Sequence, residues 1–378
     1  MQLNDQEFIS KTFREYYQRL DVTPPDVSRR EFGFGWKDKI DYRHKCFVDG
    51  KQLKEFLVKE TPLYASYSLA RYEFPSARPM PKKNYLGCDL VFDLDTTYQH
   101  DSHNSLYCLY CMQHVSQDAI RLKEEFLVKD FGFSEKEILL VFSGQKGFHL
   151  HVRNHAVQQL SSNARKELLD YISGKFDVSK MLLEGDEMAD NVERRKAQAL
   201  GPGKQSRGWS KKIFTKTLTL FQVLDAKKMR EYGFNGKNIT YVKENQGEAI
   251  ANLENGKWDA FCAEPAEVFK KIADEIRVST TVEIDKAVTY DTARLIRLPN
   301  SIHGSTGFAA KNMPALDPSS FDPSKQCTIT QNTTRTIKAS EDIAITFAEQ
   351  TYELKKDAPA EVPLALALFM ACKKKTVT

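Results

Sequence analysis

One stretch constrains this chain more than any other: an apolar run that ends in two acidic residues. From Leu86 to Asp95 it reads Leu-Gly-Cys-Asp-Leu-Val-Phe-Asp-Leu-Asp, and its central residues favour a single β-strand. Because side chains of a strand alternate between its faces, Asp93 and Asp95 are expected on the same side. The two carboxylates repel each other, and a cation that prefers oxygen ligands, such as Mg²⁺ or Mn²⁺, would relieve that repulsion. A solvated strand end is the ordinary alternative.

Length and composition set the class of protein. The chain has 378 residues, of which 41% are hydrophobic and 28% charged, as in globular proteins with one large or two medium domains. The net charge of +4 is compatible with an anionic partner. No apolar run is long enough to span a membrane, and the N-terminus lacks the pattern of a secretion signal, so a cytoplasmic location is expected. The seven cysteines are then expected to be thiols or metal ligands.

Hydrophobic periodicity predicts helices and strands in alternation. Helices are expected over 4–20, 51–60, 115–129, 157–172 and 258–276. Strands are expected over 30–36, 137–142, 148–153 and 281–285. The order indicates an α/β (α+β) fold with a mixed β-sheet core and flanking helices. The core is expected to comprise residues 1–175 and 261–378, with a smaller, mostly helical insertion over 176–260.

A short polar loop after the acidic stretch carries four candidate zinc ligands. Cys108 and Cys111 have the C-x₂-C spacing of a zinc knuckle, and His100 and His103 lie a few residues upstream. Four ligands within so short a span, near residues 100–111, would form a closed structural clip rather than a catalytic site. His114 is a substitute for His100. Two buried cysteines beside two solvated histidines would give the same spacing.

A glycine-containing loop offers groups that suit a phosphate. In Ser143-Gly-Gln-Lys-Gly147 the backbone N–H groups, a hydroxyl and a lysine lie together, and His149 follows in the next strand. The order of residues is not that of a Walker loop. A plain glycine hairpin between two strands is the alternative.

A late segment adds two arginines and a further carboxylate. Arg294 and Arg297 lie three residues apart and precede His303, and guanidinium groups bind phosphate oxygens in pairs. Two solvated arginines on a surface helix turn are the alternative. Asp285 ends the strand predicted over 281–285, and a third carboxylate would complete a two-metal cage.

Together and in this order, these motifs resemble the catalytic small subunit of archaeal and eukaryotic DNA primase. The resemblance covers about residues 31–307, is greatest to archaeal members, and rests on Val91-Phe-Asp-Leu-Asp95, the Cys/His knuckle, Ser143-Gly-x-x-Gly-x-His149, Asp285 and Arg297-Leu-Pro-x-Ser-x-His303-Gly304. It implies that the catalytic Mg²⁺ or Mn²⁺ ions are bound by Asp93, Asp95 and Asp285. It also implies that the incoming nucleotide is contacted by Ser143, Gly144, His149, Arg297, His303 and Arg43. The family's knuckle is usually richer in cysteine, and many relatives carry arginine where this chain has Gln145-Lys146.

The resemblance implies a DNA-dependent nucleotidyltransferase that makes short primers de novo on single-stranded DNA during replication. Its chemistry would be two-metal phosphoryl transfer, with Zn²⁺ in a structural role. The implied partners are a large iron–sulfur subunit in a heterodimer, the template strand and nucleoside triphosphates, in the cytoplasm of an archaeal cell and with no membrane. Two other functions stay open: a repair or plasmid primase-polymerase, and a zinc-containing nuclease or nucleic-acid-binding protein.

Overall fold

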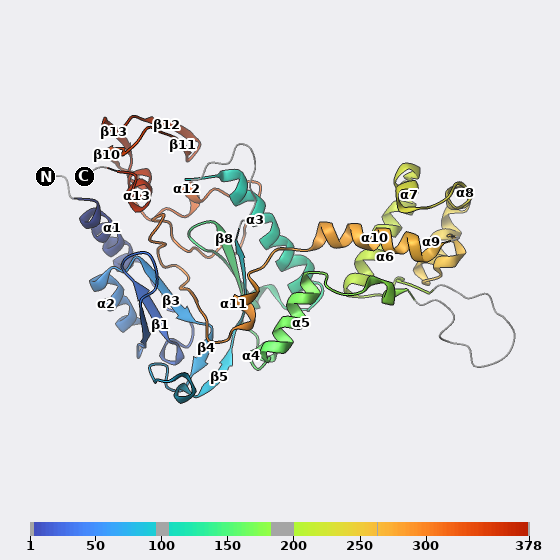
Figure 1. Cartoon of the computed structure of the whole chain (residues 1–378), viewed down its shortest axis with the longest axis horizontal. Helices are drawn as coiled ribbons and strands as arrows, with labels where there is room; N and C mark the ends of the chain where they lie inside the picture. Colours follow the sequence, from blue (N-terminus) through green and yellow to red (C-terminus); the bar gives the residue numbers. More distant parts are fainter. Residues whose placement is uncertain (1–3, 96–105, 183–199, 263, 377–378) are drawn as a thin grey trace. The chain divides into compact units, whose positions relative to one another are not determined.

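The structure, a computed structural model, describes residues 4–95, 106–182, 200–262 and 264–376 (Figure 1). The chain forms two compact units. Unit 1 comprises residues 1–123, 133–169 and 283–378, and unit 2 comprises residues 124–132 and 170–282. Both units therefore contain segments that are far apart in the sequence.

Unit 1 contains two principal sheets, and both are antiparallel. The first has the strand order β6 (Leu90–Asp95), β8 (Gly147–Val152), β7 (Ile138–Phe142). The second has the strand order β2 (Tyr42–Lys45), β1 (Phe32–Gly35), β3 (Tyr64–Ser68), β9 (Leu295–Arg297). Helices and sheets occur together, so the predicted α+β fold is confirmed. The mixed sheet is wrong for the described residues, where every pair of named strands runs antiparallel.

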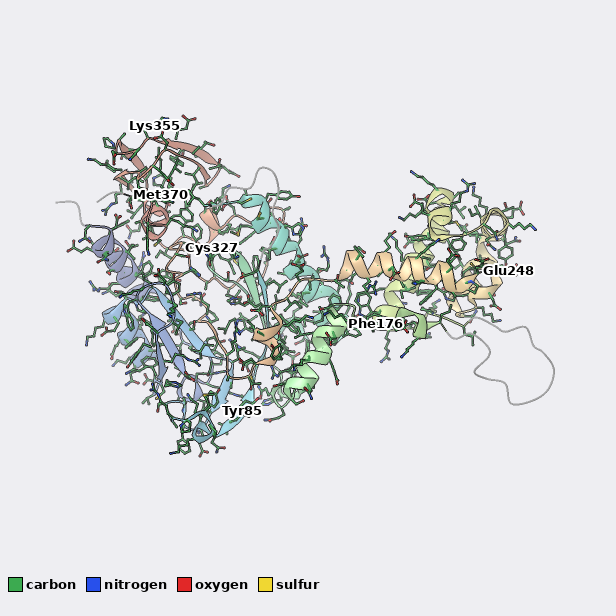
Figure 2. The ribbon with its side chains drawn as sticks, in the orientation of Figure 1. Tyr85, Phe176, Glu248, Cys327, Lys355 and Met370 are labelled. Atoms are coloured by element: carbon green, nitrogen blue, oxygen red, sulfur yellow. The ribbon has the colours of Figure 1, made fainter. Side chains whose placement is uncertain are left out.

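Three two-stranded sheets complete the strands in the described part of unit 1. They pair β4 (Ala70–Tyr72) with β5 (Tyr85–Cys88), β10 (Thr334–Lys338) with β13 (Pro359–Pro363), and β11 (Ile343–Phe347) with β12 (Gln350–Leu354). The last two lie near α13 (Leu364–Cys372), a helix of nine residues. Met370 of α13 and Cys327 are fully buried, whereas Lys355 is exposed and pairs with Asp342 (Figure 2). Among the described helices, none is both long and apolar enough to cross a bilayer.

The N-terminal helices form where the sequence predicts them. In α1 (Asp5–Arg19) the Asn4 side chain accepts a hydrogen bond from the N–H of Glu7, which satisfies a free donor of the first turn. The buried stripe of α1 includes Phe8, Phe13 and Tyr17. Helix α2 (Gly50–Glu60) begins after an Asp49 cap and packs against α1. The remaining helices of unit 1 are α3 (Leu109–Arg121), α4 (His155–Gln158), α5 (Ser162–Ile172, whose last residues belong to unit 2), α11 (Lys286–Tyr290) and α12 (Pro323–Gln326).

The predicted single strand from Leu86 to Asp95 is wrong, because the chain forms two strands there. β5 pairs with β4, β6 pairs with β8, and Asp89 lies between them. The Asp89 carboxylate accepts a hydrogen bond of 2.7 Å from the buried guanidinium of Arg30, and its N–H donates to the carbonyl of Leu69. A buried ion pair therefore fixes the point at which the chain passes from one sheet to the next.

The strand predicted over 281–285 is also wrong. The described chain has no strand there, and Asp285 is the N-cap of α11. Three helices differ as well: 157–172 is divided between α4 and α5, and 115–129 becomes α3 followed by a π-helical segment, Leu122–Val128. Helix α10 (Pro265–Thr280) starts later than predicted, because Pro265 occupies its first turn, where proline is favoured.

Unit 2 is helical in its described part. Its helices are α6 (Gly208–Val223), α7 (Ala226–Tyr232), α8 (Gly236–Glu244), α9 (Gln246–Glu254) and α10. Its core is aromatic: the Phe221 and Phe261 rings lie 5.0 Å apart, and those of Trp258 and Phe269 lie 5.2 Å apart. The insertion expected over 176–260 lies within this unit, which also includes α10 because that helix packs against α6 and α7.

Candidate active site

Asp93 and His149 are cross-strand neighbours in the first sheet. The register of β6 and β8 pairs Asp93 with His149 and Asp95 with Gly147. Directly opposed residues of an antiparallel pair project from the same face. The His149 Nε2 atom lies 3.4 Å from Asp93 Oδ1. One end of β6 therefore carries two carboxylates beside an imidazole.

Asp285 reaches this end of β6 from a distant part of the sequence. Its backbone N–H donates a hydrogen bond of 2.8 Å to the carbonyl of Asp93, and its side chain accepts one of 2.9 Å from the N–H of Ala287. Thr289, in the same short helix α11, donates through its hydroxyl to the carbonyl of Val91. These bonds hold α11 along β6 and bring the third carboxylate to the other two.

The carboxylates are held where ionisation is unfavourable. Burial, and then the charge of Asp285, raise the pKa of Asp93 to about 6. Burial and then Asp93 raise the pKa of Asp95, against an opposing effect of Lys146 and His149. Arg294 lies 3.8 Å from Asp285 and, like Arg297, favours the ionised form of Asp93. Asp93 and Asp95 therefore have raised pKa values in spite of the cations near them.

The basic side of the site is built on β9 and the segment that follows it. The guanidinium of Arg297 lies 5.3 Å from the centre of the Tyr64 ring, and burial lowers its pKa to about 10. The Tyr64 ring also contacts His303, whose Nδ1 lies 2.9 Å from the hydroxyl of Ser305. Burial and then Arg297 lower the pKa of His303 well below its usual value.

His149 is neutral at physiological pH for the same reasons. Burial and then Arg297 lower the pKa of His149 to about 4. Arg297 thus influences the pKa of both His149 and His303, which come from different segments of the chain. The two imidazoles can offer a hydrogen bond to a phosphate but no positive charge, so the charge must come from the arginines and from Lys146.

The glycine loop is tied to the His303 segment. The Ser143 hydroxyl accepts hydrogen bonds from the N–H groups of Gly147 and Gln145, and the hydroxyl of Thr306 donates to the carbonyl of Gly144. Gly144 has φ +86°, and a Cβ on it would come within 2.8 Å of the His303 Cβ. A Cβ on Gly147 would lie 2.1 Å from the carbonyl oxygen of Leu94. Glycine is therefore required at both positions.

Arg43 lies apart from this cluster. Its Nε atom is 3.1 Å from Oε1 of Glu31, and its guanidinium also bonds the carbonyl of Ala293, next to Arg294. It is exposed and sits at the edge of the site. The structure therefore brings together Asp93, Asp95, Asp285, Ser143, Gly144, His149, Arg297 and His303, and places Arg43 on the rim beside them.

The candidate zinc ligands are described only in part. His100 and His103 lie outside the described residues. Cys108 directly precedes α3 and Cys111 lies in its first turn, and a hydrogen bond connects their sulfurs. Burial and that hydrogen bond raise the pKa of Cys111 to about 11. The two thiols are therefore adjacent, as a knuckle requires.

The acidic cluster suits a hard divalent cation by its chemistry. Asp93 Oδ1 is buried without a hydrogen-bond partner, and Arg297 Nη1 is likewise an unpaired donor among the described residues. Carboxylate oxygens are the ligands that Mg²⁺ and Mn²⁺ prefer. Among the described residues no three His, Cys, Asp or Glu side chains already form a metal cage, and the Asp285 side chain caps α11 instead. That cap uses the Oδ1 atom of Asp285, whereas its Oδ2 atom lies 3.8 Å from Arg294 Nη2.

Two residues at the site escape prediction from the sequence. Tyr64 contacts both Arg297 and His303, and nothing in its local sequence marks it. Glu31 binds Arg43 and is fully buried. Its one available signal is a charge within the apolar strand predicted over 30–36.

Comparison with known proteins identifies the family of this chain. The family model described as "DNA primase small subunit" matches residues 92–314, more than half of the chain. The "DNA primase small subunit PriS" of Methanococcoides burtonii is 26% identical over 99% of this chain and 98% of its own length. That of Methanocella arvoryzae is 29% identical over 98% of each chain, and that of Methanosarcina barkeri is 30% identical over 84% of this chain and 83% of its own. The chain therefore belongs to the DNA primase small subunit family.

Proposed function

We propose that this protein makes short primers de novo on single-stranded DNA during replication, by two-metal phosphoryl transfer. Membership of the family supports nucleotidyltransferase activity. The observation that carries the finer proposal is the hydrogen bond from the N–H of Asp285 to the carbonyl of Asp93. It joins carboxylates from two distant segments beside the basic side chains Arg294 and Arg297.

In this proposal Asp93, Asp95 and Asp285 hold two Mg²⁺ or Mn²⁺ ions. When bound, these ions would lower the pKa of the attacking 3′-hydroxyl and neutralise the leaving pyrophosphate. The raised pKa of Asp93 supports this role, because a carboxylate without a counter-charge gains most from a cation. Asp93 Oδ1, which has no hydrogen-bond partner among the described residues, would be a ligand atom for the cation.

The basic side of the site would hold the triphosphate of the incoming nucleotide. Arg297 brings a positive charge and an unpaired N–H group. His149 and His303 would each donate one hydrogen bond as neutral imidazoles. Ser143 and Gly144 would shape the loop that approaches the phosphates, and Arg43 would contribute from the rim of the site.

A structural Zn²⁺ is the second part of the proposal. Cys108 and Cys111 would be two of its ligands, and His100 and His103 the others. Elemental analysis of the purified chain should give one zinc per molecule, and Cys108→Ser should lower zinc content and thermal stability more than the rate of nucleotide addition. A stable wild-type protein free of zinc would rule this part out.

The relatives carry the name small subunit, which supports assembly with a large subunit. We extend the proposal to a heterodimer with an iron–sulfur large subunit, acting in the cytoplasm on template DNA and nucleoside triphosphates. Co-expression with the large subunit of the same genome, followed by size-exclusion chromatography, tests this. Separate elution of the two chains would contradict it.

An unprimed synthesis assay tests the main proposal. The protein is incubated with single-stranded DNA, Mg²⁺ or Mn²⁺, and labelled ribo- and deoxynucleotides in parallel. We expect labelled products that require template and start without a primer. Asp95→Ala should abolish them while single-stranded DNA binding remains measurable. Degradation of the template would indicate a nuclease, and binding without product would indicate a non-catalytic module.

A further inference from the structure

Helix α1 contributes two tyrosine hydroxyls to the segment 297–303, which carries two of the proposed triphosphate-binding side chains. The hydroxyl of Tyr16 donates a hydrogen bond of 2.9 Å to the carbonyl of Asn300. The hydroxyl of Tyr17 accepts one of 3.1 Å from the N–H of Ile302. The partners are 284 and 285 residues apart in the sequence. The N-terminal helix is therefore attached to the site by polar bonds as well as by its apolar stripe.

The N–H of Ile302 depends on Tyr17. Ile302 is fully buried and lies opposite Ala309 in an isolated antiparallel bridge. The backbone hydrogen bonds on either side of this bridge are made by residues 301 and 303, so the N–H of Ile302 points away from Ala309 and donates to Tyr17 instead. A buried N–H without an acceptor is costly. This position therefore requires the tyrosine hydroxyl and not only the ring.

The second attachment lies at the turn before Ile302. Asn300 has φ +63°, in the left-handed region that asparagine tolerates better than most residues. Its N–H donates a hydrogen bond of 2.6 Å to the carbonyl of Ala310, and its carbonyl accepts the bond from Tyr16. Both backbone polar groups of Asn300 are thus bonded, which stabilises the turn in this conformation.

Tyr17 also lies close to Arg297, the first residue of the segment. Burial raises the pKa of Tyr17 to about 12, and the hydrogen bond from Ile302 and the charge of Arg297 oppose that rise. The hydroxyl is therefore neutral at physiological pH, and its bond to the segment does not change near neutrality. One buried hydroxyl is thus near both the start and the middle of the segment.

We propose that Tyr16 and Tyr17 are positioning residues that set the spacing between Arg297 and His303 through the backbone of residues 300–302. This inference rests on the proposed function, in which both of these side chains contact the triphosphate. A shift of the turn would move the guanidinium relative to the imidazole and weaken their joint hold on one ligand. Helix α1, which lies outside the residues 92–314 that the family model matches, thereby acts in nucleotide binding.

Tyr17→Phe is the first variant to measure, because it removes one hydroxyl and keeps the ring. The N–H of Ile302 then loses its acceptor, so KM for the nucleoside triphosphate in unprimed synthesis should rise about three- to tenfold, with kcat changed less than twofold. Tyr16→Phe should act in the same direction but less strongly, because the carbonyl of the half-buried Asn300 can bond water instead.

Thr12→Val is the matched control. It removes another buried hydroxyl of α1, but that hydroxyl donates to the carbonyl of Phe8 within the same helix. It should therefore leave KM unchanged, even where it lowers the free energy of unfolding. A rise in KM as large as that of Tyr17→Phe would show that any weakening of α1 disturbs the site, and would overturn the inference.

Hydrogen exchange tests the same contacts without nucleotide or activity. The amide of Ile302 should exchange at least about tenfold faster in Tyr17→Phe than in the wild type and in Thr12→Val. A folded Tyr17→Phe with wild-type exchange at Ile302 and wild-type KM would refute the positioning role. Should Tyr17→Phe fail to fold, Tyr16→Phe decides by the same two measurements. Failure of the proposed function would show separately, as a wild type that makes no primers, while the exchange rates still report whether the tyrosines hold the segment.

Discussion

Two largely buried carboxylates of unit 1, Glu31 and Asp93, have opposite surroundings. Glu31 is fully buried, and its oxygens lie 2.8 Å from Lys83 Nζ, 3.1 Å from Arg43 Nε and 3.3 Å from His44 Nδ1. Asp93 is 18% exposed, has an oxygen without a hydrogen-bond partner in the described part of the chain, and lies beside two further carboxylates. A fully paired buried acid stabilises the fold, whereas an acid kept short of partners is available to a ligand. Three predictions test this distinction, and a fourth tests the strand pairing beside Asp95.

The largest effect is expected on activity, at Asp93. Asp93→Asn keeps the shape of the side chain but removes a charged ligand, so unprimed synthesis should fall about 10⁴-fold, or roughly 5.5 kcal/mol of transition-state stabilisation. The free energy of unfolding should stay equal or rise by about 1 kcal/mol, because a repulsion between carboxylates is relieved. Single-turnover rates and urea titration measure the two quantities. A rate within tenfold of the wild type would refute the metal-binding role.

Glu31→Gln should have its main effect on stability rather than on activity. It leaves the buried ammonium of Lys83 without a counter-charge, and breaking such a pair costs about 3–5 kcal/mol of unfolding free energy. The double variant Glu31→Gln, Lys83→Met is the control and should recover much of that loss, because no unpaired charge remains. Urea denaturation followed by circular dichroism measures both. A loss below about 1 kcal/mol in the single variant would show that the pair is not stabilising.

Stability should fall as pH rises through the titration of Asp93. Its pKa of about 6 in the folded protein lies above the ordinary aspartate value of 3.8, so the folded state binds the proton more tightly. The resulting contribution, up to about 3 kcal/mol, is complete below pH ~4 and is lost as the pH rises through 6. Denaturation midpoints between pH 4 and 8 reveal it, and Asp93→Asn should flatten the profile. Mn²⁺ should restore stability at neutral pH, and an Mn²⁺-independent profile would argue against a cation site.

The smallest effect concerns the glycine opposite Asp95. In Gly147→Ala the new Cβ would lie 2.1 Å from the carbonyl of Leu94 and 2.4 Å from Asp95 Oδ1, so β6 and β8 must separate. We expect a loss of about 1–3 kcal/mol in unfolding free energy. Gly247→Ala, in α9 with no atom near its added Cβ, is the control and should be neutral or slightly stabilising. Equal stabilities of the two variants would show that β6 and β8 tolerate the methyl group.

Local patterns in the sequence were sufficient for part of this picture. Strand alternation places Asp93 and Asp95 on one side of a strand, and Asn4 with Glu7 marks the start of α1. The same patterns fail at Asp285, which follows an apolar-looking run and yet caps a helix of five residues. Its contact with Asp93 joins residues that are about half of the chain apart, and no local period encodes such a contact. The resemblance to primases supplied that pairing.

The burial of Glu31 could not be predicted from the sequence, for the same reason. Its partners Arg43 and Lys83 lie 12 and 52 residues away, and the charge alone suggests exposure. The division of 86–95 into two strands depends on Asp89 meeting Arg30, again a contact between distant segments. Local sequence patterns do not predict ion pairs between such distant segments, because these pairs form only when the sheets assemble.

Calorimetric titration of Mn²⁺ into the wild type and Asp285→Asn tests the central claim most directly. The three carboxylates should bind Mn²⁺ in the wild type, and Asp285→Asn should weaken that binding at least about tenfold and abolish unprimed synthesis, while the protein stays folded. Equal Mn²⁺ affinity in the two proteins, with synthesis retained by the variant, would contradict the account.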